Sequence, residues 1–204
     1  MIKLHGVNRS NYYNMVKCAM LEKGIPFEEV LTPPSQEAEM LDRSAMGRIP
    51  FIETEKGYLA ETPAILDYLE DIAPDTLLLP ADPWERAKAK ELFFTIKLNL
   101  ELIARQGFGV LFGSEVPPSA IESMKLNLPK GIAAINRLAR YQPWVCGENF
   151  TYTDLLFYFT LVYANRSAQA NLGMDLFDEL PGARAWFEAT GSRDSVRKAI
   201  ADQG

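Results

Sequence analysis

The chain has 204 residues, of which 48% are hydrophobic and 24% charged, so it has the composition of a globular protein large enough for one or two domains. Residues 1–76 hold 7 Lys or Arg against 13 Asp or Glu, whereas residues 77–204 hold 14 of each. The net charge of −6 therefore lies in the first third of the chain. No basic stripe is present to attract nucleic acid, and an anionic ligand would need local hydrogen-bond donors.

The sequence also argues against membrane insertion and secretion. No apolar run approaches the roughly 18 residues of a membrane span, and the start "MIKLHG" lacks the apolar region of a secretory signal. Cys18 and Cys146 are far apart and form no CxxC motif, which suits a reducing cytosol. With His5 as the only histidine, no metal site is indicated. We expect a cytoplasmic protein with no metal.

The first third alternates between short strands and helices. The expected elements are a strand over 1–6, a helix over 11–24, a strand over 25–32, a short helix within 33–48, a strand pair at 50–54 and 58–61, and a helix over 62–72. The order is β-α-β-α-β-β-α. The first two strands are joined through a helix and are expected to be parallel, while the last two form a hairpin.

The rest of the chain reads as helical. A proline-rich linker, residues 77–82, leads to Asp82-Pro83-Trp84-Glu85, which has the N-cap, first-turn proline and acid of a helix start. One long helix is expected from there to about Phe108, and a second over 118–141. Thr151 and Asp154 have the spacing of a capping box at the start of a third. We expect domains at 1–76 and 83–204, the second all-helical.

Four motifs in order resemble the cytosolic glutathione transferase superfamily, of the bacterial type with a serine active site. They are "LHGVNRSNYYNMVKCAMLEKGIPFEEV", "GRIPFIE", "AETPAILDYLE" and "FTYTDLL". The resemblance covers nearly the whole chain and implies a thioredoxin-like α/β N-terminal domain followed by an all-α domain.

The chain departs from the family pattern at several positions. Thr62 replaces the commoner serine, and Pro63 removes a backbone donor where the family usually keeps one. Ser44-Ala45 stands where many members have Asn-Pro, and two bulky tyrosines, Tyr12 and Tyr13, follow the serine position.

The resemblance places the catalytic serine at Ser10. From local sequence alone, Ser10 is an N-cap that stabilises its helix by about 1 kcal/mol. As a catalytic residue, its hydroxyl would donate to the sulfur of glutathione, and the helix dipole would favour the same anion. Both effects favour the thiolate, which is the nucleophile. Tyr12 or Tyr13 is the next candidate for this role.

The glutathione-binding residues follow from the same resemblance. The Ile49–Pro50 bond is expected to be cis, with the Ile49 N–H and C=O pairing with the cysteinyl backbone of glutathione. Glu61 would bind the γ-glutamyl ammonium, and Thr62 the carboxylate, at the start of a helix. Without the resemblance, Thr62 would be an ordinary N-cap followed by Pro63.

The remaining site residues are less constrained by the motifs. Arg48 and Gln36 are candidates for the glycine carboxylate of glutathione, although Arg48 could equally be a solvated surface residue. The electrophile pocket should be apolar, and its expected lining residues are Tyr12, Phe108, Val110 and Phe112. His5 is expected to be structural.

Two classes of function are consistent with these residues. The leading hypothesis is a glutathione transferase that activates the thiol of glutathione for attack on a small hydrophobic electrophile, as in detoxification. The alternative is a non-catalytic relative that acts as a protein-interaction or regulatory module. The resemblance also implies a homodimer, with the helix over 62–72 and the first long C-terminal helix at the interface.

Overall fold

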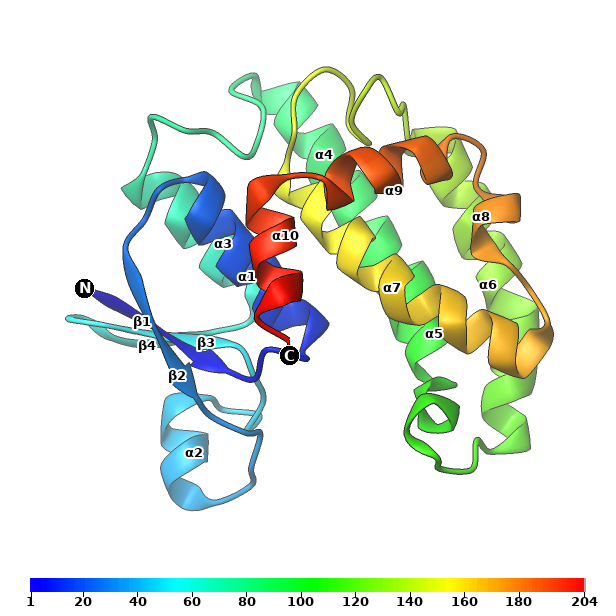
Figure 1. Ribbon diagram of the computed structural model, residues 1–204, viewed down its shortest axis with the longest axis horizontal. Helices are drawn as coiled ribbons and strands as arrows, with labels where there is room; N and C mark the ends of the chain where they lie inside the picture. Colours follow the sequence, from blue (N-terminus) through cyan, green and yellow to red (C-terminus); the bar gives the residue numbers. More distant parts are fainter. Residues whose placement is uncertain (204) are drawn as a thin grey trace. The chain divides into compact units, whose positions relative to one another are not determined.

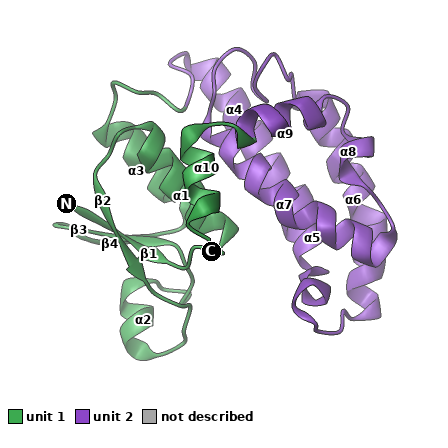
Figure 2. Cartoon of the chain, in the orientation of Figure 1, with its two compact units in different colours: residues 1–78, 191–204 green, residues 79–190 purple. Residues whose placement is uncertain are grey.

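The computed structural model describes residues 1–203 and divides the chain into two compact units (Figure 2). Unit 1 contains residues 1–78 and 191–204, and unit 2 contains residues 79–190. The expected fold class is confirmed, because a four-stranded mixed sheet with helices is followed by an all-helical unit.

Unit 1 is built on a sheet with the strand order β2-β1-β3-β4. The strands are β1 (Ile2–Gly6), β2 (Phe27–Leu31), β3 (Phe51–Thr54) and β4 (Gly57–Ala60). As predicted, β1 and β2 are parallel and β3 and β4 form an antiparallel hairpin. The β1 strand also pairs with β3 in the antiparallel direction, which joins the two halves of the sheet.

Helices cover both faces of this sheet. The α1 helix (Asn11–Glu22) and the α3 helix (Thr62–Ile72) lie on one face, and α2 (Ala38–Arg43) lies on the other (Figure 1). The core between them contains fully buried apolar side chains, among them Leu4, Val16, Met20, Phe51, Ile52, Ile65 and Leu69. Gly24 ends α1 as expected: it has φ +64°, and the next N–H, of Ile25, donates to Met20 O at 2.9 Å.

The C-terminal segment returns to unit 1. Helix α10 (Asp194–Ala201) packs against α1, and Figure 1 shows the two side by side. Arg193 binds Glu22 of α1 through two nitrogens, at 2.9 and 2.6 Å. Residues 191–204 fall within the domain expected at 83–204, but in the structure they belong to the compact unit formed by the N-terminal residues.

Unit 2 is formed by helices. They are α4 (Pro83–Ile96), a π-helical turn (Lys97–Glu101), α5 (Leu102–Arg105), a 3₁₀ turn (Phe108–Phe112), α6 (Pro118–Leu138), α7 (Tyr152–Leu172), α8 (Leu176–Glu179) and α9 (Ala183–Gly191). The predicted helix starts are confirmed. Asp82 accepts hydrogen bonds from the N–H groups of Trp84 and Glu85 at 3.0 Å, and Thr151 and Asp154 form the capping box.

The helix expected from Asp82 to about Phe108 is present from Pro83 to Arg105. Within it, residues Lys97–Glu101 form a π turn that the sequence did not indicate. At this turn α6 approaches very closely, since a Cβ on Gly131 would lie 2.0 Å from Asn99 O. Single π turns of this kind occur within α-helices and are a recognised cause of kinks.

The attachment of α10 should weaken in acid. Burial alone would raise the pKa of Glu22, but hydrogen bonds from Arg193 and Ser195 outweigh it and lower the pKa. The hydrogen bond from Lys17 lowers the pKa of Asp202. A carboxyl whose pKa is lower in the folded state stabilises the fold when the pH is above its pKa in the unfolded chain, which is about 4. That contribution is lost as the pH falls through the pKa of the folded state.

We therefore expect the amides of α10 to lose protection from hydrogen exchange, corrected for intrinsic rates, between about pH 4 and pH 2. The amides of β1 serve as the internal reference. Protection of α10 that stays constant relative to β1 across this range would contradict the prediction.

Candidate active site

The register of the sheet brings three predicted site segments to one end of unit 1. Phe51, the first residue of β3, pairs with both His5 of β1 and Ala60 of β4. Because both pairings are antiparallel, the segment that precedes β3 meets the segments that follow β1 and β4. Ser10, Ile49–Pro50 and Glu61–Thr62 lie on these three segments.

Ser10 lies at the N-terminus of α1 and caps it. Its Oγ accepts a hydrogen bond from the Tyr13 N–H at 3.3 Å, and its own N–H donates to Val7 O at 3.0 Å. A hydroxyl has two acceptor lone pairs and one donor. Capping uses only a lone pair, so the Ser10 proton can still be donated to a ligand. Capping and donation to sulfur are therefore compatible.

The alternative thiol activator Tyr13 is engaged elsewhere. Its side chain is buried, and its hydroxyl donates to Glu29 Oε2 at 2.7 Å. Burial and the bond to Glu29 raise the pKa of the Tyr13 phenol far above its usual value. Tyr13 is thus a neutral, committed donor within the fold.

Neither cysteine of the chain has the character of a nucleophile. Burial raises the pKa of the Cys18 thiol well above its usual range. Burial and the nearby Asp154 raise the pKa of Cys146 to about 11. Both thiols are protonated at neutral pH, so neither supplies a thiolate.

The segment before β3 presents a peptide group without a protein partner. The Ile49–Pro50 bond is cis, as the resemblance implies. Within residues 1–203, the Ile49 N–H and C=O make no hydrogen bond to the protein, although Ile49 is half-buried. Ser44 fixes the residue before it: Ser44 Oγ donates to Arg48 O at 2.8 Å and accepts from the Arg48 N–H at 3.2 Å.

Gln36 and Gly47 hold this segment from the other side. Gln36 Nε2 donates to Met46 O at 3.1 Å, and the Ser35 N–H donates to Gly47 O at 3.1 Å. Gly47 has φ +60°, and a Cβ there would lie 1.9 Å from Ser35 O. The amide nitrogen of Gln36 also donates to Ser35 O, so both of its N–H donors are committed to the loop. The remaining carbonyl oxygen can only accept a hydrogen bond, so this geometry does not favour the expected role of Gln36 at the glycine carboxylate.

The β4–α3 junction carries an unusual backbone conformation. Glu61 has φ +69° and is the N-cap of α3, which makes Thr62 the first helical residue. The alternative reading of Thr62 as an ordinary N-cap is therefore off by one position. The first helical bond runs from the Ile65 N–H to Glu61 O, so the N–H groups of Thr62 and Ala64 have no acceptor within the helix.

The backbone strain at Glu61 is not explained by any side-chain hydrogen bond or ion pair of this residue within residues 1–203. Non-glycine residues with positive φ are uncommon and concentrate at binding sites. Glu61 is exposed, and its carboxylate has no hydrogen bond or ion pair in the described part of the chain. The junction thus combines one unpaired carboxylate with two unpaired N–H groups. This arrangement matches a ligand that carries an ammonium and a carboxylate on neighbouring atoms.

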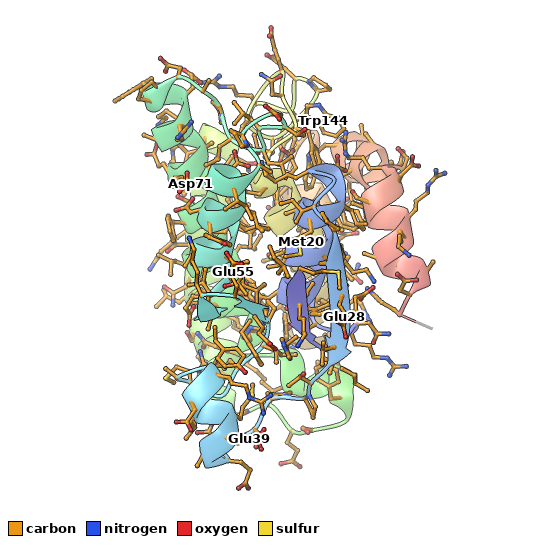
Figure 3. The ribbon with its side chains drawn as sticks, turned by 90° about the vertical axis from the view of Figure 1, so that its left-hand side faces the viewer. Met20, Glu28, Glu39, Glu55, Asp71 and Trp144 are labelled. Carbon is orange, nitrogen blue, oxygen red and sulfur yellow. The ribbon has the colours of Figure 1, made fainter. Side chains whose placement is uncertain are left out.

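Acidic side chains are spread over several elements of unit 1. Figure 3 shows Glu28, Glu39, Glu55 and Asp71, which come from β2, α2, the β3–β4 turn and α3, and all four are exposed. Against this field, Arg48 is exposed and its guanidinium forms no ion pair among residues 1–203. Arg48 is therefore available to an anion, as its candidacy for the glycine carboxylate requires.

His5 is structural, as expected. Its ring is buried and stacked on Phe51 at 4.5 Å, and its nitrogens lie 3.1 Å from Thr32 Oγ1 and 3.2 Å from Glu53 Oε2. Burial lowers its pKa, an effect that outweighs the neighbouring Glu53. It is neutral at pH 7 and holds β1 to β3.

The four residues expected to line an electrophile pocket come from both units. Tyr12 is a half-buried residue of α1 in unit 1. The other three lie on the 3₁₀ turn of unit 2, where Phe108 is buried against Tyr163 with ring centres 5.9 Å apart, and Val110 and Phe112 are exposed. Their role as a pocket stays a prediction.

Three contributors to the site were missed by sequence reasoning. Ser44 was noted only as a departure from Asn-Pro, yet it is buried and bridges the Arg48 backbone. Gly47 carried a detectable signal, since a glycine in a loop often marks a positive φ. The positive φ of Glu61 had no signal in sequence, because glycine and asparagine are the residues expected there.

The structure also bears on metals and membranes. No group of three or more His, Cys, Asp or Glu that could hold a metal ion occurs in residues 1–203. Over the same residues, no helix is long and apolar enough to cross a membrane.

Comparison with known proteins decides the family. Residues 4–77 match the family model described as the N-terminal domain of glutathione S-transferase, and residues 118–189 match the corresponding C-terminal domain. A glutathione S-transferase of Pseudomonas putida is 42% identical over 204 residues, which are 100% of this chain and 93% of the relative. The chain belongs to the glutathione S-transferase family. Members of this family are enzymes that use glutathione as a co-substrate.

Solved structures of the family have the same fold. Glutathione transferase F2 from Populus trichocarpa aligns with a TM-score of 0.81 and 20% identity over 100% of this chain and 99% of its own. A glutathione transferase homologue from Sulfitobacter, solved with bound glutathione, aligns at 0.78 and 22% over 100% and 98%.

The close approach at Gly47 can be tested by substitution. Gly47→Ala should destabilise the protein by more than about 1 kcal/mol, because it adds a clash with Ser35 O to the cost of positive φ. Gly24→Ala is the matched control, since Gly24 has a similar φ of +64° with no atom within 4 Å. Urea denaturation measures both free energies of unfolding, and equal losses would contradict the proposed clash.

Proposed function

We propose that the chain binds reduced glutathione at the end of the sheet formed by the segments around Ser10, Ile49 and Glu61, and activates its thiol for attack on a small hydrophobic electrophile. The observation that carries this proposal is the convergence of three ligand-binding features on that end. These are the unpaired peptide group of Ile49, the strained and unpaired Glu61, and the available hydroxyl proton of Ser10.

Each part of glutathione has a complementary group. The cysteinyl backbone pairs with the Ile49 N–H and C=O, beside Pro50, in the manner of an added strand. The γ-glutamyl ammonium binds the Glu61 carboxylate. Its carboxylate binds the Thr62 hydroxyl and the N–H groups at the start of α3, where the helix dipole favours an anion.

The glycine carboxylate binds Arg48, whose guanidinium supplies a local positive charge for it.

The chemistry assigned to Ser10 is stabilisation of the thiolate. Its hydroxyl donates to the sulfur while its lone pair stays on the Tyr13 N–H, so the cap and the donor coexist. A hydrogen bond to the charged form of a group lowers its pKa. The thiolate then attacks the electrophile, which is held in an apolar pocket lined by Tyr12, Phe108, Val110 and Phe112. Detoxification of such electrophiles in the cytoplasm is the proposed role.

Glutathione binding is tested with Glu61→Ala and the control Glu55→Ala. We expect saturable binding of reduced glutathione by calorimetry in the wild type and in the control, and loss of binding in Glu61→Ala. Glu55 is an exposed carboxylate on the β3–β4 turn, so the control makes the same change in net charge. Failure of the wild type to bind glutathione would overturn the proposal and favour a protein-interaction module.

The role of Ser10 is tested with Ser10→Ala. Glutathione affinity should stay nearly unchanged, while the pKa of the bound thiol should rise by about one to two units, as expected from loss of a hydrogen bond to a charged group. Ultraviolet absorbance of the thiolate against pH measures this shift. An unchanged thiol pKa and unchanged turnover would transfer the role to Tyr12.

We also propose a homodimer whose interface includes α3 and α4. Large apolar side chains are exposed on both helices, among them Ile72 on α3 and Trp84 and Phe94 on α4. Sedimentation velocity at micromolar concentration should give the mass of two chains. A sedimenting mass of 22.9 kDa, that of one chain, would reject the dimer.

A further inference from the structure

The loop that carries Ser10 is held by the far end of the chain. Residues Val7 to Ser10 connect β1 to α1, and the Asn8 side-chain amide in this loop donates to the backbone carbonyl of Asp202, just after α10. On the other side of the loop, Asn14 Nδ2 of α1 donates to Asn8 O at 2.8 Å. Asn8 is therefore fixed through both its side chain and its backbone.

A buried charge keeps Asp202 in place. Lys17 of α1 is fully buried, and its Nζ lies 2.6 Å from Asp202 Oδ2 and 2.7 Å from Glu29 Oε2. Burial favours the neutral amine, but the hydrogen bonds and charges of these two carboxylates outweigh it and raise the pKa of Lys17. A buried ammonium is destabilising without partners, so moving Asp202 away from α1 would cost the fold stability.

Glu29, which binds Lys17, also holds Tyr13, the residue whose N–H donates to the Ser10 hydroxyl. The Tyr13 N–H donates to Ser10 Oγ, while the Tyr13 hydroxyl donates to Glu29 Oε2, the oxygen that also binds Lys17. The Tyr13 ring is packed so tightly on the backbone that a Cβ on Gly6 would lie 2.4 Å from it. Tyr13 therefore cannot shift without disturbing both Gly6 and Glu29.

We infer that Asn8 and Asp202 are positioning residues for Ser10, and that the C-terminal segment orients the serine hydroxyl through them. A hydroxyl that must donate to one sulfur atom needs its supporting groups held to within about 0.5 Å. The positional part of this inference concerns the protein alone. Its catalytic consequence rests on the proposed function.

The positional part is tested in the protein without ligand. Asn8→Ala and Asp202→Ala should speed hydrogen exchange at the Ser10 and Tyr13 amides, which donate to Val7 O and Ser10 Oγ. Asp194→Ala is the matched control, because it removes an exposed carboxylate from α10 that forms an ion pair with Arg197 on the same helix. Unchanged exchange at both amides in Asn8→Ala would overturn the inference, whether or not glutathione binds.

The catalytic consequence is tested by a double-mutant cycle. Asn8→Ala should retain glutathione affinity, raise the pKa of the bound thiol and lower kcat roughly tenfold, since small displacements of catalytic groups have large effects on rate. In a Ser10→Ala background the same change should have almost no further effect on either quantity. An equal effect in both backgrounds would show that Asn8 does not act through Ser10 and would overturn this part.

The two proposals fail in different ways. Absence of glutathione binding in the wild type, together with faster exchange in Asn8→Ala, would reject the proposed function and keep the positional inference. Normal binding and turnover in Asn8→Ala, with unchanged exchange, would reject the inference and keep the proposed function.

Discussion

The pairing of β3 with strands on both sides is the constraint on which the candidate site depends. Phe51 begins β3 opposite His5 and Ala60, so three chain segments that are distant in sequence meet at one end of the sheet. The His5 ring strengthens this register by stacking on Phe51 and by contacting Glu53. A shift of β3 by one residue would turn its alternate side chains to the other face and carry Ile49 away from Glu61.

Unit 1 places two of its positive charges in contrasting environments. Its surface is acidic, yet it buries the ammonium of Lys17 among carboxylates and leaves the guanidinium of Arg48 exposed. The buried charge holds the chain together, and the exposed one is available to a ligand. The overall field of the unit opposes an anionic ligand. Such a ligand would therefore have to be held by local groups, namely the N–H groups at the start of α3 and the guanidinium of Arg48.

Features set by local chemistry were predictable from the sequence, and features set by distant contacts were not. The caps at Asp82 and at Thr151 involve residues within three positions of each other, and both were found. The π turn near Asn99 lies against Gly131 of α6, and the segment before α10 is bound to α1 by the contact of Arg193 with Glu22, so both involve residues far apart in sequence. The site positions themselves came from family resemblance, since Ser10 or Glu61 alone is an ordinary helix start.

The return of the C-terminal segment to unit 1 makes the helical unit an insertion in the chain of its neighbour. A ribosome releases residues 1–78 long before it releases Asp202, so unit 1 must wait for the whole of residues 79–190 before Lys17 meets its second carboxylate. Closing such a long loop costs only slightly more entropy than closing a short one, but it delays completion. During synthesis, the Ser10 loop would be the last part of the candidate site to become ordered.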